Sequence, residues 1–184
     1  MNILTAPLPA YLTVCGEDYP INTDFRTWIK IEEILADYSV SSVDKVIHIF
    51  SLAFTSSVPS DAQEALFAIA KFLSPFHSFE KSKGKANEAA SPLFSFSQDG
   101  GFIYAAFLSQ YGIDLTSTHL HWWRFLSLFS ALCDCKFTEI VKIRGINLAK
   151  ISDPNQKSFL RRMKKIYRLK SNNSDISSEI EKIF

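Results

Sequence analysis

Two histidines and two cysteines are the residues of this chain whose types could bind a metal ion. His119 and His121 precede a strongly apolar segment, and Cys133 and Cys135 follow it. Imidazole nitrogen and thiolate sulfur are the usual ligands of zinc. H-x-H and C-x-C are not the common spacings of structural zinc sites, however, and a helix between the pairs would separate them by about 20 Å. We therefore expect a capping or surface histidine and small, partly buried thiols in place of a metal site.

This sequence contains no recognised motif for nucleophilic catalysis or for phosphate binding. There is no G-x-S-x-G elbow and no glycine-rich loop of the P-loop or dinucleotide type. Asp99-Gly100-Gly101 precedes an expected helix and is read as a cap or hinge. The neighbouring carboxylates Glu32 and Glu33 would point apart on a helix, which is typical of a solvated face. The chain is therefore expected to be neither an enzyme nor a cofactor-binding protein.

The composition favours a mostly α-helical protein with a sizeable core. Hydrophobic residues make up 47% of the 184 residues and 16 are Phe, whereas Gly and Pro number only 6 and 7, too few for a turn-rich β-sandwich. The first residues lack the pattern of a secretory signal, and no window of 18 apolar residues predicts a membrane span. Three cysteines without a disulfide framework indicate reduced thiols in a cytoplasm.

The first 76 residues are expected to form a small β-hairpin and three helices. The hairpin is predicted from Tyr11–Val14 and Tyr19–Ile21 around the turn Cys15–Asp18. The helices are expected to start near Asn22 or Thr23, near Ser41 or Ser42, and at Ser60. The first helix is expected to have its main row at Phe25, Trp28, Ile29, Glu32 and Leu35. The second is expected to carry Val43, Val46, Ile47, Phe50 and Phe54, and the third to bury Ala62, Leu66, Ile69, Ala70 and Leu73.

Residues 98–132 are expected to form the centre of the fold as two apolar helices. Asp99 is the predicted cap of the first, and Gly112 is its predicted end. Thr116, Ser117 or Thr118 is expected to cap the second, which is apolar over most of its circumference and hence predicted to be buried. The core is expected to consist of residues 120–132 together with Tyr104, Phe107 and Tyr111, in a fold of six to eight helices.

The other segments complete the expected organisation. Residues 77–97 are rich in Lys, Ser, Ala and Gly without periodicity, which predicts a flexible linker or loop. Residues 98–170 are expected to form one domain with the first 76 residues, with further helices over 137–145 and 155–169. In the last of these, Phe159, Met163, Ile166 and Tyr167 are predicted to face the core. Residues 171–184 are expected to form a short amphipathic tail.

Charge is distributed unevenly along the chain. Residues 1–139 hold 9 basic and 15 acidic residues, a net charge of −6, and residues 140–170 hold 10 basic and 1 acidic, a net charge of +9. The last 14 residues hold 1 basic and 3 acidic, a net charge of −2. Such asymmetry is typical of nucleic-acid or acidic-protein contacts, of a solubilising face against the chain's own acidic half, or of head-to-tail self-association. The candidate partner-binding residues are Arg161, Arg162, Lys164, Lys165 and Arg168.

A series of motifs resembles a phage family named after gene product fifteen of a Gram-positive siphophage. The motifs are I-Y-x-A-F, Y-G-I-D-L and L-H-W-W-x-F after an Asp, with an Arg and an I-x-D segment beyond them, and they cover most of the chain. The residues that carry the resemblance here, which are read as structural, are Asp99, Tyr104, Phe107, Tyr111, Asp114, His121, Trp122, Trp123 and Arg144.

The resemblance implies a role in virion assembly. Members of that family lie in the tail module of the phage genome and are similar to tail assembly chaperones, which coat the long helical tape-measure protein. It implies a chain in the host bacterial cytoplasm, during infection or prophage induction, that binds the tape-measure protein and self-associates. No catalytic residues are carried over. The alternatives are a nucleic-acid-binding or regulatory phage protein that uses the basic segment 157–170, and an enzyme or metal protein that uses the His and Cys pairs.

Overall fold

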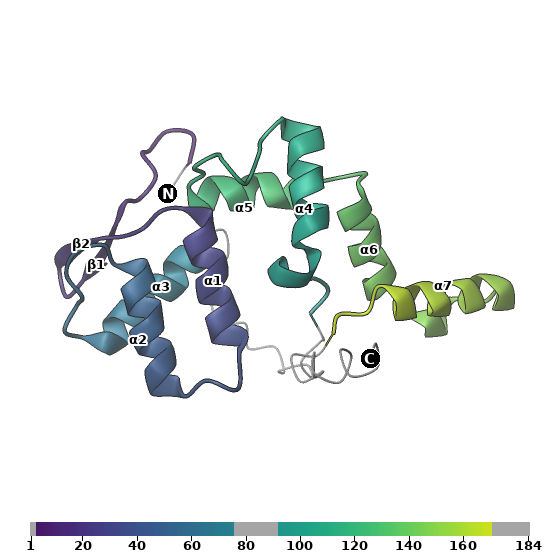
Figure 1. Cartoon of the computed structure of the whole chain (residues 1–184), viewed down its shortest axis with the longest axis horizontal. Helices are drawn as coiled ribbons and strands as arrows, with labels where there is room; N and C mark the ends of the chain where they lie inside the picture. Colours follow the sequence, from purple (N-terminus) through teal and green to yellow (C-terminus); the bar gives the residue numbers. More distant parts are fainter. Residues whose placement is uncertain (1–2, 76–91, 171–184) are drawn as a thin grey trace, which may run out of the picture. The chain divides into compact units, whose positions relative to one another are not determined.

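The computed structural model describes residues 3–75 and 92–170, which fold into two compact units (Figure 1). Of the described residues, 3–75 and 113–131 form unit 1, and 92–112 and 132–170 form unit 2, so the chain contributes two stretches to each. The described residues contain seven α-helices, one short 3-10 helix and one two-stranded hairpin, which confirms the predicted fold class. Within them, no helix is long and apolar enough to span a membrane.

The N-terminal hairpin of unit 1 consists of β1 (Tyr11–Val14) and β2 (Glu17–Pro20), paired antiparallel. Cys15 and Gly16 form its turn with φ angles of 50° and 80°. Positive φ at both central residues is the pattern of a type I′ turn, whose twist matches that of the flanking strands. Leu12 and Val14 alternate with exposed neighbours and are buried, and β1 packs against α3.

Four helices complete unit 1, and each is preceded by a capping residue whose side chain accepts a hydrogen bond from a backbone N–H of the first turn. They are α1 (Phe25–Ala36), α2 (Ser42–Ala53), α3 (Ala62–Leu73) and α5 (Trp122–Ser130), capped by Asp24, Ser41, Asp61 and His121. The start predicted for α1, near Asn22 or Thr23, is close to the observed cap Asp24, whereas the cap predicted for α5, at Thr116, Ser117 or Thr118, was wrong by three to five residues. For α5 the reason is tertiary, because Trp122 N–H donates to Thr23 O at 2.8 Å and Phe25 N–H donates to Leu120 O at 2.9 Å, which ties the two helix starts together.

The buried faces of α1, α2 and α3 differ in part from the predicted rows. Leu35, Val43 and Ile47 are exposed by 45%, 69% and 58%. In their place Ile31, Ile49, Ala53, Ala65 and Phe72 are buried, alongside the correctly predicted Phe25, Trp28, Phe50, Phe54, Ile69 and Leu73. Each of these helices has apolar residues on more than one face, so periodicity alone admits two orientations and packing selects one.

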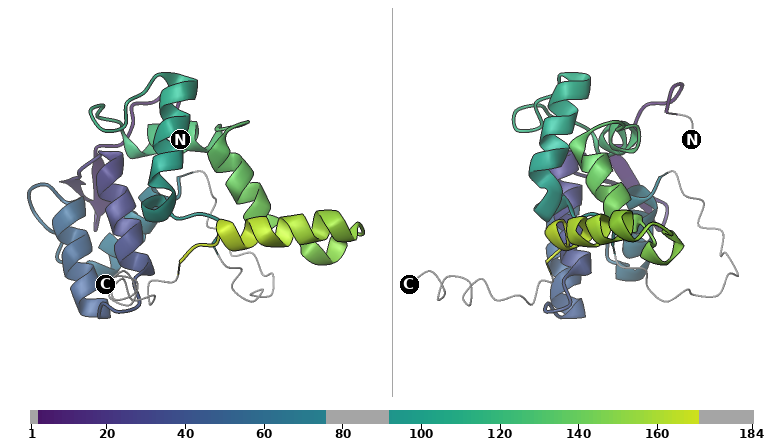
Figure 2. Two further views of the ribbon diagram at one scale, coloured as in Figure 1. Left: turned by 45° about the vertical axis from the view of Figure 1, so that its right-hand side comes forward. Right: turned by 90° about the vertical axis from the view of Figure 1, so that its right-hand side faces the viewer.

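Unit 2 consists of α4 (Phe96–Tyr111), α6 (Lys136–Gly145), a 3-10 helix (Leu148–Lys150) and α7 (Pro154–Ile166). Figure 2 shows these helices from two further sides; α4 packs on α6, and α6 packs on α7. The helix α4 is capped by Ser95 and not by Asp99, and it ends as predicted at Gly112, which has a φ of 64°. The buried hydrophobic residues of unit 2 are Ile103, Ala106, Phe107, Leu132, Phe137 and Ile140.

Two expectations meet a different outcome, and two predicted segments lie mainly or wholly outside the described residues. The helices predicted to share one central core, α4 and α5, belong to different units. The apolar residues of α7 are not core, since no residue of α7 is buried and Phe159 and Ile166 are exposed by 52% and 61%. The predicted linker lies outside the described residues except for its last part, where α4 already begins at Phe96. The predicted tail lies wholly outside them.

Candidate partner-binding surfaces

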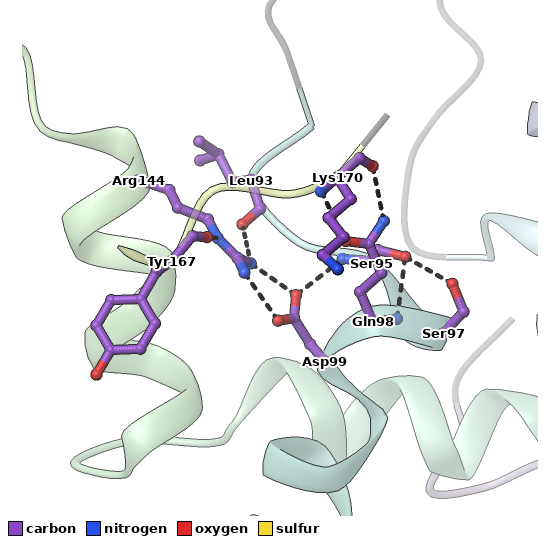
Figure 3. Close-up of polar contacts among 8 residues, drawn as sticks. All are labelled: Leu93, Ser95, Ser97, Gln98, Asp99, Arg144, Tyr167 and Lys170. Atoms are coloured by element: carbon purple, nitrogen blue, oxygen red, sulfur yellow. Dashed lines mark hydrogen bonds and ion pairs between the residues drawn. The ribbon is translucent and has the colours of Figure 1, made fainter. Parts of the chain in front are cut away.

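A buried ion pair between Asp99 and Arg144 forms the polar centre of unit 2 (Figure 3). Arg144 Nη1 donates to Asp99 Oδ2 at 2.6 Å, and Nη2 donates to Oδ1 at 2.9 Å. The two side chains are only 11% and 2% exposed. Ser95 N–H donates to the same carboxylate at 3.0 Å. Bidentate geometry and an added donor satisfy both charges, so the pair can be buried without an unpaired ion.

The remaining donors of Arg144 hold two chain segments in place. Nε donates to Tyr167 O at 2.6 Å and Nη1 donates to Leu93 O at 3.0 Å. Gln98 adds a reciprocal pair with the Lys170 backbone, at 2.8 and 2.9 Å (Figure 3). The segment that follows α7 is therefore fixed to the start of α4. This network gives α7 a defined position although α7 buries none of its own side chains.

The α7 face, defined here as Phe159, Arg162, Met163, Lys165 and Ile166, combines apolar and basic side chains. Phe159, Met163 and Ile166 follow at helical spacing, and the Arg162 guanidinium lies 6.0 Å from the Phe159 ring centroid. Of the five predicted partner-binding residues, four are exposed: Arg161, Arg162, Lys165 and Arg168. Lys164 differs, because its ammonium donates to Ile146 O at 2.7 Å, at the end of α6.

The unit-1 groove is an apolar depression of about 460 Å³ beside the hairpin. Tyr11 and Phe67 are the exposed aromatic residues of its wall, at 57% and 53%. The Lys71 ammonium lies 4.2 Å from the Phe67 ring centroid. The groove is lined by Ile3, Pro9, Tyr11, Leu12, Thr13, Glu64, Phe67, Ala68, Lys71, Phe72, Pro75 and Trp123. Apolar walls with few polar groups are suited to the side chains of a docked helix.

Trp122 and Trp123, adjacent in the family-like motif, have different roles. Trp122 is completely buried, and its indole N–H donates to Leu73 O at 3.2 Å. Trp123 is half-buried, donates to Phe72 O at 2.9 Å, and presents part of its ring to the unit-1 groove. Trp122 is thus structural, whereas Trp123 is available to a partner in that groove.

The other motif residues of unit 1 shape the chain before α5. Asp114 Oδ1 accepts from Thr116 N–H at 2.8 Å and from the Thr116 hydroxyl at 2.6 Å, and these bonds lower the pKa of its carboxyl. Arg26 donates to the backbone carbonyls of Leu115 and Thr118. The loop is therefore held in a fixed conformation that delivers His121 to the helix start.

In unit 2, the motif aromatics lie on α4. Phe107 is fully buried and packs edge-on against Tyr111, with ring centroids 5.6 Å apart. Tyr104 is half-buried, and burial raises the pKa of Tyr111. Phe107 is therefore a core residue of unit 2, as predicted, whereas Tyr104 and Tyr111 are only half-buried.

His121 acts as a helix cap with both ring nitrogens engaged. Nδ1 accepts from Trp123 N–H at 3.1 Å, and Nε2 lies 3.0 Å from Pro9 O. Since Nδ1 must carry a lone pair for this bond, the neutral ring is the one that caps α5. Burial lowers the pKa of His121, with repulsion from Arg124 and His119 adding to the effect.

We expect stability to fall as His121 is protonated. The unfolded chain binds this proton near the ordinary pKa of 6.5, and the folded chain binds it only at lower pH. The His121 contribution is therefore complete above 6.5 and decreases as the pH falls toward the folded pKa. Urea unfolding between about pH 5 and about pH 8 should show a shallower dependence in His121→Asn, which keeps a capping oxygen. The exposed His48→Asn should retain the wild-type dependence, and an equal change in both variants would contradict the assignment.

Sequence reasoning missed a group of three exposed side chains beside the groove. The Cys15 thiol donates to Glu64 Oε2 at 3.0 Å and lies 3.9 Å from Asp61 Oδ2. The hydrogen bond to Glu64, with further contributions from the two negative charges, raises the pKa of Cys15 to about 11. The thiol is therefore protonated at neutral pH and is a poor nucleophile. The group places two carboxylates at the start of α3, next to the apolar wall.

Comparison with known proteins gives one match. A family model described as "Bacteriophage Gp15 protein" matches residues 4–169 of the chain. The curated proteins and the solved structures that were searched contain no match. The matched range includes both units and every motif residue described above.

Proposed function

We propose, because this chain belongs to the bacteriophage Gp15 family, that it acts as a tail assembly chaperone that binds the tape-measure protein and self-associates. Tape-measure proteins are long and helical, and their apolar surface needs cover before the tail tube forms around them. A small helical protein that presents apolar helix faces could supply that cover. The chemistry required is recognition, with no reacting group.

The observation that carries the proposal is that two helices expose apolar side chains at helical spacing. On α2, Val43 and Ile47 are one turn apart and are 69% and 58% exposed. On α7, Phe159 and Ile166 are exposed by similar fractions. Apolar surface of this kind on a helix is typical of protein-binding sites, because water contact with it is unfavourable. A client helix packed on α2 and a neighbouring copy on α7 would cover both.

The charges of the two units support self-association. The described part of unit 1 has 5 basic and 10 acidic residues, a net charge of −5. The described part of unit 2 has 11 basic and 4 acidic residues, a net charge of +7. Opposite charges on the units of neighbouring copies attract, and a row of linked copies would bind one long client with greater avidity than a single copy does.

The α2 surface provides the direct test of client binding. Val43→Glu with Ile47→Lys replaces the apolar pair by an ion pair at i,i+4, which leaves the net charge unchanged and supports the helix. We expect co-purification with the tape-measure protein of the same phage to fall by at least about tenfold, as for loss of a binding hot spot. The matched control is Asp44→Glu with His48→Lys, which installs the same pair on exposed positions of the same helix. Equal retention by both variants would contradict the proposal.

Nucleic acid is the second candidate partner, and the exposure of α7 favours it. Arg161, Arg162, Lys165 and Arg168 are all exposed, and Phe159 offers a ring on which a base could stack. Affinity for DNA or RNA would then fall steeply with salt, since each neutralised phosphate releases a counterion. A gel-shift titration over a range of salt concentrations decides between this partner and protein.

A further inference from the structure

The unit-1 groove and the α7 face match in length and in chemistry. Along α3, Glu64, Phe67 and Lys71 lie at i, i+3 and i+7 on the groove wall. On α7, Phe159, Met163 and Ile166 lie at i, i+4 and i+7. Each row spans about 10 Å of helix, given a rise of 1.5 Å per residue. Three apolar anchors at this spacing are the usual means by which a helix enters an apolar groove.

Charge is also complementary at one end of the groove. Asp61 and Glu64 lie at the start of α3, where the Cys15 thiol is already drawn to both carboxylates. Arg162 and Lys165 flank the apolar row of α7 on one side. A helix docked with this side toward Glu64 would bring opposite charges together at the rim of an apolar contact, where they favour the correct register.

The other end of the groove carries the opposite sign. Lys71 lies there, over the Phe67 ring. Lys71 should therefore weakly repel a basic helix. Replacing Lys71 by an acidic residue is expected to strengthen docking, the opposite of the effect expected for replacing Glu64 by a basic residue. Pairing of α7 with α7 of another copy is disfavoured, because it would place the cations of both helices together. Among the described surfaces, the acidic unit 1 of another copy is the complementary partner for α7.

We propose that the α7 face of one copy docks in the unit-1 groove of a second copy, an interface that rests on the self-association in the proposed function and gives it a location. The contact is heterologous, since groove and helix are different surfaces. Each added copy leaves one groove and one α7 face open at the two ends, so the contact repeats in rings or rows. Trp123 and Phe67 contribute to the apolar wall, and Phe159, which is 52% exposed, is the aromatic anchor of the docked helix.

Reciprocal charge reversal in the full-length chain tests this interface. The first variant is Arg162→Glu with Lys165→Glu on α7; the second is Gln63→Lys with Glu64→Lys at the groove, which spares the Asp61 cap. We expect sedimentation velocity to show self-association of the wild type, and at least about tenfold weaker self-association of either variant alone. An equimolar mixture should associate again as alternating copies, because each variant's groove then meets an α7 of opposite charge.

Two further variants separate a specific interface from a general charge effect. Lys142→Glu with Lys150→Glu removes the same charge from exposed positions of unit 2 outside α7 and should leave self-association unchanged. Lys71→Glu should strengthen it, by removing the one cation of the groove. Circular dichroism and thermal melting would verify that every variant is folded.

Several results would overturn the interface. They are a wild type that stays monomeric at every concentration, a mixture that associates no better than its components, and self-association lost equally in the Lys142 and Lys150 variant. Salt-sensitive binding of α7 to nucleic acid without self-association would also overturn it. Failure of this interface is distinguishable from failure of the proposed function. Assemblies that form through this contact but retain no tape-measure protein would contradict the proposed function and support the interface. A monomer that retains the tape-measure protein would contradict the interface and support client binding.

Discussion

Replacing Asp99 by alanine is expected to destabilise unit 2 by about 3–5 kcal/mol, because it leaves the Arg144 guanidinium buried without its counter-ion. Both oxygens of Asp99 accept from Arg144, at 2.6 and 2.9 Å, and the pair is almost entirely shielded from water. Urea unfolding followed by far-UV circular dichroism should show the loss. Amide hydrogen exchange should place it in α4, α6 and α7, which the pair connects.

The exposed ion pair of the same unit is the matched control. Lys136 lies 3.4 Å from Glu139, with side chains 50% and 61% exposed. Lys136→Ala should leave stability almost unchanged, since water already solvates both charges. Arg144→Lys keeps the charge of the buried pair but cannot reproduce the fork that also reaches Tyr167 O and Leu93 O, so it should be destabilising as well. Wild-type stability of Asp99→Ala or Arg144→Lys would refute the role assigned to this pair.

Trp122→Ala is expected to unfold or severely destabilise unit 1, at a cost of about 3–5 kcal/mol. The ring is fully buried, stacks on Phe125 with centroids 5.7 Å apart, and bonds Leu73 O. All three tryptophans of the chain lie in unit 1, so the fluorescence of Trp28 and Trp123 would follow the unfolding of this variant.

The neighbouring Trp123→Ala should behave differently. Its ring is only half-buried and lines the unit-1 groove, so a smaller loss of stability and a marked loss of partner binding are expected. Chemical unfolding and sedimentation velocity, performed on both variants, make the comparison. If Trp123→Ala were as destabilising as Trp122→Ala, Trp123 would be a core residue, and its assigned role in partner binding at the unit-1 groove would be contradicted.

Local signals in the sequence predicted the elements well. The hairpin, three early helices, α4, α6 and α7 were all expected close to their observed positions, because capping residues, glycines and apolar periodicity act over a few residues of chain. Ser41 and Gly112 are examples in which the local signal was sufficient. His121 is the contrary example. It is a poor intrinsic cap compared with Thr116, Ser117 or Thr118, and it caps α5 because Thr23 and Leu120 bring the start of α1 to that position.

The candidate surfaces depended far more on tertiary contacts. Asp99 and Arg144 both belong to the family-like motifs, but nothing in their spacing indicated that they form an ion pair across 45 positions of the sequence. The five basic residues of the C-terminal helix were expected as a group, yet Lys164 is drawn to the end of α6 and the other four are exposed. The unit-1 groove joins β1, α3 and Trp123, which are far apart in sequence, and no local pattern marks it.

By itself, the sequence determined a mostly helical chain with a small hairpin, an uneven charge distribution and membership of a phage family. The tertiary structure decided which apolar faces are buried. Val43, Ile47, Phe159 and Ile166 all satisfy the helical period that predicts a core, and all remain exposed. The physical reason is that periodicity identifies a face able to be buried, whereas burial also requires another surface to pack against it. For these residues the described part of the chain supplies no such surface that covers them, and we propose that a partner does.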